Sequence, residues 1–528
     1  MMKYLDLKWP SVGHLLEEAS QEFKNKTLFI FEGEKLTFDQ VNRRVNQTAN
    51  ALKKLGVAKN HKVCVMLPNG FEFPIIWLAC AKLGAVMVPA NINYREHDLK
   101  YILSDSEAAA LIIHAECLAV LTEVKPNLPL LKNVIVLGEA LAGYYSYKEI
   151  MERASDEFEI REVGENDLLN IQYTSGTTGF PKGCMLTHRY WLILGFNPVG
   201  LYGITSDDVN LTAQPFYYLD PQWNTVLCLA AGITLVIMPR FSPSKFWTAV
   251  NANNVTMFYV LGTMPLLLLK QAENPGLEKN HRLRFVICSG IVPQLHETFE
   301  KRWNVRWREV YGSTESGGDL GVSLEDAESV GSGSVGIPWP TKEAKIIDDT
   351  GKEVLAGEIG ELLVRGEPMF QGYWKKPEAT VEAFRGDWRR TGDLFYKDEK
   401  GLFYITGRLK DMIRRSDENI AAAEVESVLV EHDKIKLAAV VAVPDELRSE
   451  EVKAYIVLKD GESKKTVPPE AILEFAKQKL AYFKVPRYIE YVDDLPRTPS
   501  ERIAKHKLIR AKDDLRKNSY DGVDKLWR

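Results

Sequence analysis

Cysteine is scarce in this chain, and its few cysteines show no pattern. They number six among 528 residues and are scattered, at Cys64, Cys80, Cys117, Cys184, Cys228 and Cys288. There is no Cys-x-x-Cys pair and no His/Cys cluster at metal-ligand spacing. A disulfide scaffold and a zinc module are therefore excluded, and we expect free thiols in a reducing compartment.

The sequence also lacks an excess of positive charge and a long hydrophobic run. Its formal net charge of -5 gives no electrostatic footprint for nucleic acid, so we expect no such partner. The longest apolar stretch, 226–238, contains Gly232 and is too short to span a bilayer. The first eight residues lack a signal-peptide core, and 525–528 form no peroxisomal address. These absences predict a cytoplasmic enzyme without a transmembrane segment, and they leave loose membrane association open.

The chain does have the length and the patterning of a multidomain α/β protein. At 528 residues it is too long for one core. Strand and helix patterns alternate from 63 to 113, which is typical of parallel sheets covered by helices. We predict a large N-terminal body of doubly wound, mostly parallel sheets over 1–408, including a β-rich subdomain over 335–408. A small α+β domain is expected over 412–528, after a charged segment at 409–411.

A loop rich in glycine and hydroxyl residues follows the apolar run 168–172. Its candidate phosphate-binding residues are Thr174, Ser175, Gly176, Thr177, Thr178, Gly179 and Lys182. The glycines allow backbone N–H groups to turn inward, the hydroxyls add donors, and the lysine supplies a cation, which suits a polyphosphate. The Walker order is absent, so a GTPase or an ordinary ATPase motor is a poor interpretation. For the loop alone, a flexible surface connection is the alternative.

After the loop, we expect a helix over 186–195 and a strand over 211–216.

Three later segments add groups that could bind a nucleotide. Residues 311–315 place an aromatic ring, hydroxyls and a carboxylate in what we predict to be one tight turn after the strand 307–310. Asp393 follows a glycine. Arg408 stands where a pattern of short strands and turns gives way to a charge-rich segment. Taken singly, either residue would more often be a solvated surface charge. The GxGxxG pattern at 331–336 is not a dinucleotide site, because neither a preceding strand nor a following helix is indicated.

Together these segments resemble the successive core motifs of the adenylate-forming family of acyl-CoA synthetases, peptide-synthetase adenylation domains and luciferases. The resemblance covers almost the whole chain, from 36–38 through 84–89 and 372–380 to 496–499. Residues 360–430 look most similar to small and medium acyl-CoA ligases of the crotonobetaine/carnitine-CoA ligase type. The resemblance implies that a carboxylate attacks the α-phosphate of Mg-ATP to give acyl-AMP and pyrophosphate. The thiol of coenzyme A then displaces AMP.

The resemblance also implies a role for each motif residue. Residues 174–179 and Lys182 would hold the β- and γ-phosphates. Tyr311, next to Gly312, would stack on adenine, and Thr314 would touch the α-phosphate. The metal Mg²⁺ would be held by Glu315 together with Thr174.

In the C-terminal part, Asp393 would accept both ribose hydroxyls, because a carboxylate has two acceptor oxygens. Arg408 would add a second ribose or phosphate contact. Lys410 matches the position at which the family's small C-terminal domain pivots between the two steps; a plain charged linker is the alternative. Arg502 would be the cation that bridges the substrate carboxylate and the α-phosphate.

The sequence departs from the family pattern in three places. Asp417 stands where glycine is usual, which adds a side chain and a negative charge near the expected pantetheine path. Glu501-Arg502 stands where a Gly-Lys pair is usual. The positive charge is kept, but a planar guanidinium group replaces a compact ammonium group. Lys505 is a substitute cation with the wrong spacing. Tyr218 takes the place of a histidine near the acyl pocket, where an aromatic wall can still shape the site.

The acid that is activated is less clearly indicated. Asp220, beside Tyr217, Tyr218 and Trp223, could receive a quaternary ammonium by charge and cation–π attraction. The competing interpretation is that Asp220 is a helix N-cap and Pro221 the first helical residue. An enzyme that loads a carrier protein and a degenerate nucleotide-binding protein remain alternatives to an acyl-CoA ligase, and a homodimer is left open.

Overall fold

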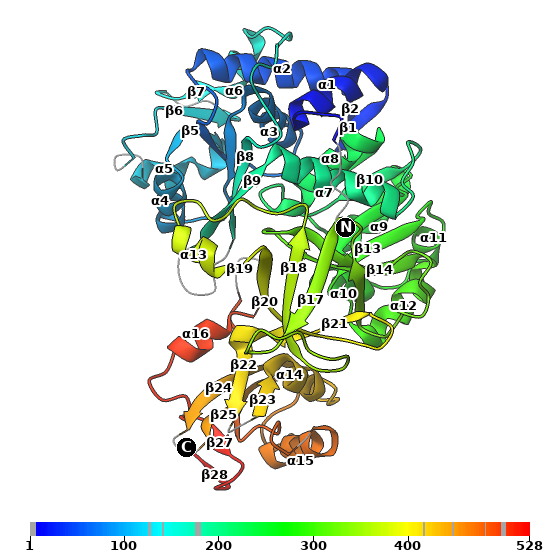
Figure 1. Cartoon of the computed structure of the whole chain (residues 1–528), viewed down its shortest axis with the longest axis vertical. Coiled ribbons are helices and arrows are strands. Elements are labelled where there is room, and N and C mark those ends of the chain that lie inside the picture. Colours follow the sequence, from blue (N-terminus) through cyan, green and yellow to red (C-terminus); the bar gives the residue numbers. More distant parts are fainter. Residues whose placement is uncertain are drawn as a thin grey trace. The chain divides into compact units, whose positions relative to one another are not determined.

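The computed structural model divides the chain into two compact units (Figure 1). The first unit comprises Met1–Glu343 and Arg365–Asp387, and the second comprises Ala344–Val364 and Trp388–Arg528. The structure describes residues 7–124, 128–139, 142–174, 181–415, 418–445, 448–480, 482–497 and 503–528.

The first part of the first unit is an alternation of strands and helices. Its elements are α1 (Val12–Glu22), β1 (Thr27–Phe31), β2 (Glu34–Thr37), α2 (Phe38–Lys54), β3 (Lys62–Met66), α3 (Glu72–Leu83), β4 (Val86–Pro89), α4 (Glu96–Asp105), β5 (Ala108–His114), η1 (Ala115–Cys117), α5 (Leu118–Val124), β6 (Asn133–Leu137), β7 (Tyr145–Ser146) and α6 (Tyr147–Glu152). The sequence Thr37-Phe38-Asp39-Gln40 predicts a capping box, and the box forms at the start of α2, where Thr37 and Gln40 bond to each other's backbone N–H groups.

The same alternation continues toward residue 343. The elements are β8 (Leu168–Thr174), β9 (Lys182–Thr187), α7 (His188–Leu201), β10 (Val209–Thr212), α8 (Leu219–Ala231), β11 (Thr234–Ile237), α9 (Pro243–Ala252), β12 (Met257–Leu261), α10 (Met264–Leu269), α11 (Pro275–Glu278), β13 (Phe285–Ser289), α12 (Pro293–Trp303), β14 (Arg306–Ser313), β15 (Gly317–Gly321) and β16 (Ser334–Pro338). Two short elements, α13 (Pro377–Glu382) and β19 (Phe384–Arg385), complete the unit.

The strands of the first unit form mostly parallel sheets, as predicted. One has the order β7-β6-β5-β3-β4-β8-β9 and is parallel except for the β8–β9 pair. In the other, β14-β13-β12-β10-β11-β1 are parallel neighbours, with β2 antiparallel at one end and β15 and β16 at the other. Parallel sheets of this kind need helices on their faces, which the α-elements between the strands supply.

Two helices of this unit end at a glycine in the left-handed conformation before the next strand begins. Gly84 has φ of 67° after α3, and Gly232 has φ of 63° after α8. A side chain at Gly232 would also collide with the ring of Phe23, whose Cζ lies 2.3 Å from an ideal Cβ. These glycines therefore turn the chain from helix into strand within a residue or two.

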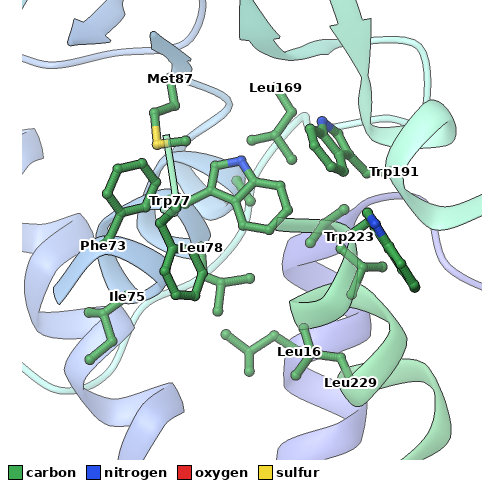
Figure 2. Packing of buried hydrophobic residues seen from close by; sticks show 14 of the residues in the cluster. Leu16, Phe73, Ile75, Trp77, Leu78, Met87, Leu169, Trp191, Trp223 and Leu229 are labelled. Carbon is green, nitrogen blue, oxygen red and sulfur yellow. The ribbon is translucent and has the colours of Figure 1, made fainter. Parts of the chain in front are cut away.

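The largest core of the first unit is rich in tryptophan (Figure 2). The rings of Trp77 on α3 and Trp191 on α7 meet edge to face, with centroids 4.9 Å apart. The buried Trp77 Nε1 donates to Asn170 Oδ1 on β8 at 2.8 Å. Strand β8, which leads into the glycine-rich loop, is thus tied to the core just before the loop.

Two sequence-based expectations for the first unit are wrong in detail. The helix expected over 186–195 begins at His188, because the preceding residues form the unpredicted strand β9. The sequence did not indicate strand β9, because it contains Gly183 and glycine is depleted in strands. The strand expected over 211–216 ends at Thr212.

The second unit holds antiparallel strands and a compact α+β region. Strands β17 (Lys342–Ile347), β18 (Gly360–Gly366), β20 (Trp388–Lys397) and β21 (Phe403–Arg408) follow one another in one sheet, with β17 and β18 crossing the unit boundary. The later elements are η3 (Leu409–Asp411), β22 (Met412–Arg415), β23 (Glu418–Ala421), α14 (Ala422–Val430), β24 (Ile435–Asp445), β25 (Ser449–Leu458), α15 (Pro469–Lys479), β26 (Tyr488–Tyr491), α16 (Lys505–Arg510), β27 (Tyr520–Asp521) and β28 (Leu526–Trp527). The domain boundary predicted at 409–411 stays a prediction.

Candidate active site

Strands β8 and β9 flank the glycine-rich loop in the sequence and pair with each other antiparallel. Thr174 and Lys182 are paired at the end next to the loop, and opposite residues of an antiparallel pair project from the same face. The structure therefore brings these two predicted site residues together. The remaining loop residues predicted to bind phosphate lie outside the described residues: Ser175, Gly176, Thr177, Thr178 and Gly179.

Helix α4 holds both ends of this loop. The Tyr101 hydroxyl donates to the Pro181 carbonyl at 2.9 Å, just after the loop. The Tyr173 hydroxyl, just before the loop, donates to Asp105 Oδ2 at 2.5 Å. Burial, followed by the hydrogen bond to Asp105, raises the pKa of Tyr173, so its hydroxyl keeps its proton. The base of the loop is thus fixed by a neighbouring helix.

The segment that contains the predicted adenine and metal residues is a strand followed by a turn. Tyr311 and Gly312 still belong to β14, so the prediction of one tight turn over 311–315 is wrong. Only 314–316 form the turn before β15. A side chain at Gly312 is impossible here, because its Cβ would lie 2.0 Å from the Gly317 carbonyl oxygen. The pairing of β14 with β15 draws the two strands this close.

Neighbouring segments fix the turn at Thr314 and Glu315. The Tyr190 hydroxyl on α7 donates to the Thr314 carbonyl at 2.9 Å. The Phe370 N–H donates to the Glu315 carbonyl at 2.7 Å. The backbone of the turn is therefore positioned by parts of the chain that are distant in sequence.

The predicted acyl-site residues cluster at the start of α8. The helix begins at Leu219 with Tyr218 as N-cap, so Asp220 is the second helical residue and its prediction as the N-cap is wrong. A carboxylate in the first turn still faces the positive end of the helix dipole. The Gln222 side chain donates to the Tyr218 carbonyl at 3.0 Å, which fixes the entry into the helix.

Sequence reasoning missed two tyrosines beside these residues. The ring of Tyr259 on β12 lies 5.9 Å from that of Trp223, and its hydroxyl is 3.0 Å from Ser289 Oγ. Burial, followed by the charge of Asp220, raises the pKa of Tyr259. Burial also raises the pKa of Tyr94, with the neighbouring Tyr218 as the next cause. The signal that could have found them, an aromatic residue near a strand end, is common and unspecific.

In the second unit, the structure pairs the two predicted ribose residues with each other. Asp393 on β20 and Arg408 on β21 are opposite one another in register, and Arg408 Nε lies 2.9 Å from Asp393 Oδ1. The aspartate is buried, whereas the arginine side chain is 41% exposed. A carboxylate offers acceptor oxygens to the hydroxyl groups of a ligand.

The remaining second-unit residues are only partly described. Lys410 lies in the 3-10 turn η3, while Asp417, Glu501 and Arg502 fall outside the described residues. Lys505, the substitute cation, forms ion pairs with Glu426 at 2.7 Å and with Asp411 at 3.8 Å. Its ammonium is therefore already engaged by two carboxylates of its own unit.

The chemistry of Glu315 and Thr174 fits Mg²⁺. Carboxylate and hydroxyl oxygens are hard ligands, and Mg²⁺ at nucleotide sites takes one or two carboxylates together with substrate phosphates. Among the residues that the structure describes, no group of three or more His, Cys, Asp or Glu could hold a metal ion. In the same residues, no helix is long and apolar enough to cross a membrane.

Comparison with known proteins identifies the family. Residues 16–374 match the model of the AMP-binding enzyme family, and residues 424–502 match the AMP-binding enzyme C-terminal domain. The crotonobetaine/carnitine–CoA ligase of Salmonella paratyphi A is 31% identical over 515 residues, which cover 94% of this chain and 98% of that protein.

Two solved structures are similar over nearly the whole chain. The anthranilate CoA ligase AuaEII in complex with anthranoyl-AMP has a TM-score of 0.86 at 29% identity, covering 96% of this chain and 98% of its own. ATP-bound MatB from Rhodopseudomonas palustris has a TM-score of 0.86 at 27% identity, covering 95% of this chain and 99% of its own.

The chain therefore belongs to the AMP-binding enzyme family. Within it, the protein is an AMP-forming acyl-CoA synthetase, which activates a carboxylic acid with ATP as acyl-AMP and transfers the acyl group to coenzyme A. The predicted fold class, the reaction and the use of ATP and coenzyme A are confirmed. The roles of individual residues stay predictions.

Proposed function

We propose that this acyl-CoA synthetase activates a small or medium carboxylic acid that carries a quaternary ammonium group. The observation that carries the proposal is the carboxylate of Asp220 in the first turn of α8, whose charge acts on the buried Tyr259, with the ring of Tyr259 5.9 Å from that of Trp223. A cation is attracted both by a carboxylate and by the faces of aromatic rings. The name of the Salmonella relative, crotonobetaine/carnitine–CoA ligase, supports the same class of acid.

An acid without a cation is the competing substrate. The aromatic rings around Asp220 would also cover a short alkyl chain, because large rings bury much apolar area. The carboxylate itself discriminates between the two classes. It would be desolvated without compensation by an uncharged chain but would be neutralised by an ammonium group.

Substrate-dependent exchange of labelled pyrophosphate into ATP tests this proposal. We expect a higher kcat/KM with crotonobetaine than with butyrate or octanoate. Asp220→Asn should lower kcat/KM for crotonobetaine by about tenfold or more, as expected for a lost charge contact, and spare butyrate. Asp207→Asn, at an exposed aspartate of the same unit, is the matched control. Equal or better use of the uncharged acids by the unaltered enzyme would refute the ammonium site.

We also propose how the first unit holds the nucleotide. Lys182 and the loop that precedes it would bind the β- and γ-phosphates, and Tyr311 would stack on adenine. Thr314 would contact the α-phosphate. Glu315 and Thr174 would hold Mg²⁺, which when bound neutralises phosphate charge. The reaction itself needs positioning and charge neutralisation, because an anionic carboxylate must approach an anionic phosphate.

In the second unit, Asp393 and Arg408 are proposed to bind the ribose, and Arg502 to bridge the two reacting anions. The domain proposal is an N-terminal domain over 1–408, a hinge at 409–411 around Lys410, and a mobile C-terminal domain over 412–528. The charged sequence of the hinge supports it, because such a segment can change its backbone conformation in solvent.

A cytoplasmic location is proposed as well. Support comes from the cysteines, all of which are among the described residues: none of the six forms a disulfide, and five of them are buried. Cysteines outside disulfides are typical of proteins in a reducing compartment.

A further inference from the structure

Tyr373 touches two of the residues that are proposed to hold the nucleotide. Its hydroxyl donates to Glu315 Oε1 at 2.9 Å. Lys182 Nζ lies over its ring, 4.9 Å from the centroid. One side chain therefore contacts both the carboxylate of the β14–β15 turn and the cation at the base of the glycine-rich loop.

Other contacts, which involve neither of those residues, fix the position of Tyr373. Its N–H donates to Thr380 Oγ1 on α13 at 2.9 Å, and the centroid of its ring lies 4.9 Å from that of the buried Phe370. The preceding Gly372 has φ of +127°, and a Cβ there would lie 2.6 Å from Thr380 Cγ2. An isolated β-bridge between Tyr373 and Cys184 joins the segment to β9. The position of Tyr373 is therefore fixed independently of its contacts with Glu315 and Lys182.

These contacts restrain the two charged side chains in different ways. A hydroxyl that donates to a carboxylate oxygen limits rotation of the carboxylate. An aromatic face attracts an ammonium group without offering it a counter-charge. The lysine is thereby held in place, yet its charge is not neutralised by the ring and can act on phosphate.

We propose that Tyr373 is a positioning residue for Mg-ATP. Its hydroxyl orients Glu315 toward the metal, and its ring orients Lys182 toward the phosphates. The proposal rests on the proposed roles of Glu315 and Lys182. In this role Tyr373 contacts none of the reacting atoms and transfers no proton.

The hydroxyl is tested by the Mg²⁺ dependence of ATP binding, measured by calorimetry without any acid present. Tyr373→Phe keeps the ring and its packing on Phe370 but removes the donor. We expect the Mg²⁺ concentration for half-maximal ATP affinity to rise about tenfold, the effect of losing a hydrogen bond to a charged group. Binding of AMP without Mg²⁺ should be unchanged. In pyrophosphate exchange, KM for Mg-ATP should rise more than kcat falls.

A double-mutant cycle separates a positioning role from a general structural one. Glu315→Gln should raise the Mg²⁺ concentration for half-maximal ATP affinity. In that background, Tyr373→Phe should cause no further rise. The ring is tested by comparing Tyr373→Leu with Tyr373→Phe. Loss of the ring should weaken ATP binding without Mg²⁺ by a further factor of about three to five, as expected for a cation–π contact. This difference should vanish in a Lys182→Met background.

Tyr404→Phe is the matched control, because the Tyr404 hydroxyl donates to Asp398 Oδ2 at 3.1 Å in the second unit. It should bind Mg-ATP like the unaltered protein. An unchanged Mg²⁺ dependence in Tyr373→Phe, beside a clear effect of Glu315→Gln, would overturn the proposal for Tyr373 and leave Glu315 in its role. No effect of Glu315→Gln would overturn both. Tyr373→Phe keeps these tests decisive if Tyr373→Leu does not fold, because it retains the packed ring.

Discussion

The nucleotide residues proposed in the two units differ in how they are held. In the first unit, tyrosine hydroxyls from elements distant in sequence donate hydrogen bonds to the site residues or their neighbours: Tyr101 to Pro181, Tyr190 to Thr314, and Tyr373 to Glu315. In the second unit, Asp393 and Arg408 hold each other across neighbouring strands. The first arrangement suits a rigid cradle for the nucleotide, and the second is a local pair within a hairpin.

The departures from the family pattern divide unevenly between the units. The first unit keeps the motif residues of the glycine-rich loop and departs at Tyr218, near the acyl pocket, whereas Asp417, Glu501 and Arg502 lie in the second unit. Nucleotide binding and acyl transfer should therefore be separable in this enzyme. Binding by the first unit should be robust, and the rates of the chemical steps should depend on how the second unit tolerates its changes.

The largest effect is expected when the first unit loses its cation. Lys182→Met removes the charge proposed to neutralise the phosphates, and we expect pyrophosphate exchange to fall by about 10²–10³. The matched control is Lys53→Met, because Lys53 also lies over an aromatic ring, that of Phe158, at 5.7 Å. Equal losses in both variants would mean that the effect is not specific to the phosphate site.

A smaller loss is expected at the substituted cation of the second unit. Arg502→Ala should lower pyrophosphate exchange by about 10- to 100-fold, because the approach of two anions loses its bridge. Arg502→Lys should raise exchange above the unaltered level, because a compact ammonium replaces a planar fork. Transfer from preformed acyl-AMP to coenzyme A, assayed separately, should change less. Unchanged exchange in Arg502→Ala would show that Arg502 is not the bridging cation.

A third variant tests whether the bracing of the loop matters. Tyr173→Phe removes the donor to Asp105 just before the loop and leaves that carboxylate without this bond. We expect KM for ATP to rise by about five- to tenfold with a small change in kcat, because a poorly held loop binds phosphate less well. Tyr145→Phe, at a tyrosine that is 45% exposed, is the control. A change in kcat alone would argue against a role in ATP binding.

The sequence predicted local features well and long-range contacts poorly. The capping box at Thr37 was predicted because its residues are three apart. The glycine-rich loop could be recognised because its residues are consecutive in the sequence, and its role stays a prediction. The bond between Tyr373 and Glu315 joins residues 58 positions apart, and no local pattern marks it. The motif around Tyr373 was recognised, but the partners of its side chain depend on how α13 packs.

The errors have the same origin. Asp220-Pro221 has the composition of a helix start, yet α8 begins earlier because Tyr218 takes the N-cap position. Tyr311 was expected in a turn, but it lies in β14, and the glycine that follows it is required by the close approach of Gly317. Pairing between strands therefore decided conformations that local propensity left ambiguous.

The smallest expected effect concerns stability, and it lies in the second unit. Lys453 on β25 is buried, with its ammonium 2.5 Å from Glu490 Oε2 and 2.5 Å from the Leu515 carbonyl. Burial lowers its pKa to about 8 despite the opposing effect of Glu490. Between this pKa and the ordinary value of 10.5, the unfolded chain binds more protons than the folded one, so stability increases with pH.

From pH 8 to pH 9 we expect the free energy of unfolding of the second unit to gain about 1 kcal/mol from Lys453. Well below pH 8 the lysine is protonated in both states and the contribution no longer changes. The measurement is hydrogen exchange of β24–β25 peptides across a urea series at each pH. Lys453→Met is the reference, because other lysines and tyrosines titrate in both proteins and cancel. An identical pH slope in the variant would mean that the buried lysine keeps its proton throughout, held by Glu490 more strongly than burial opposes it.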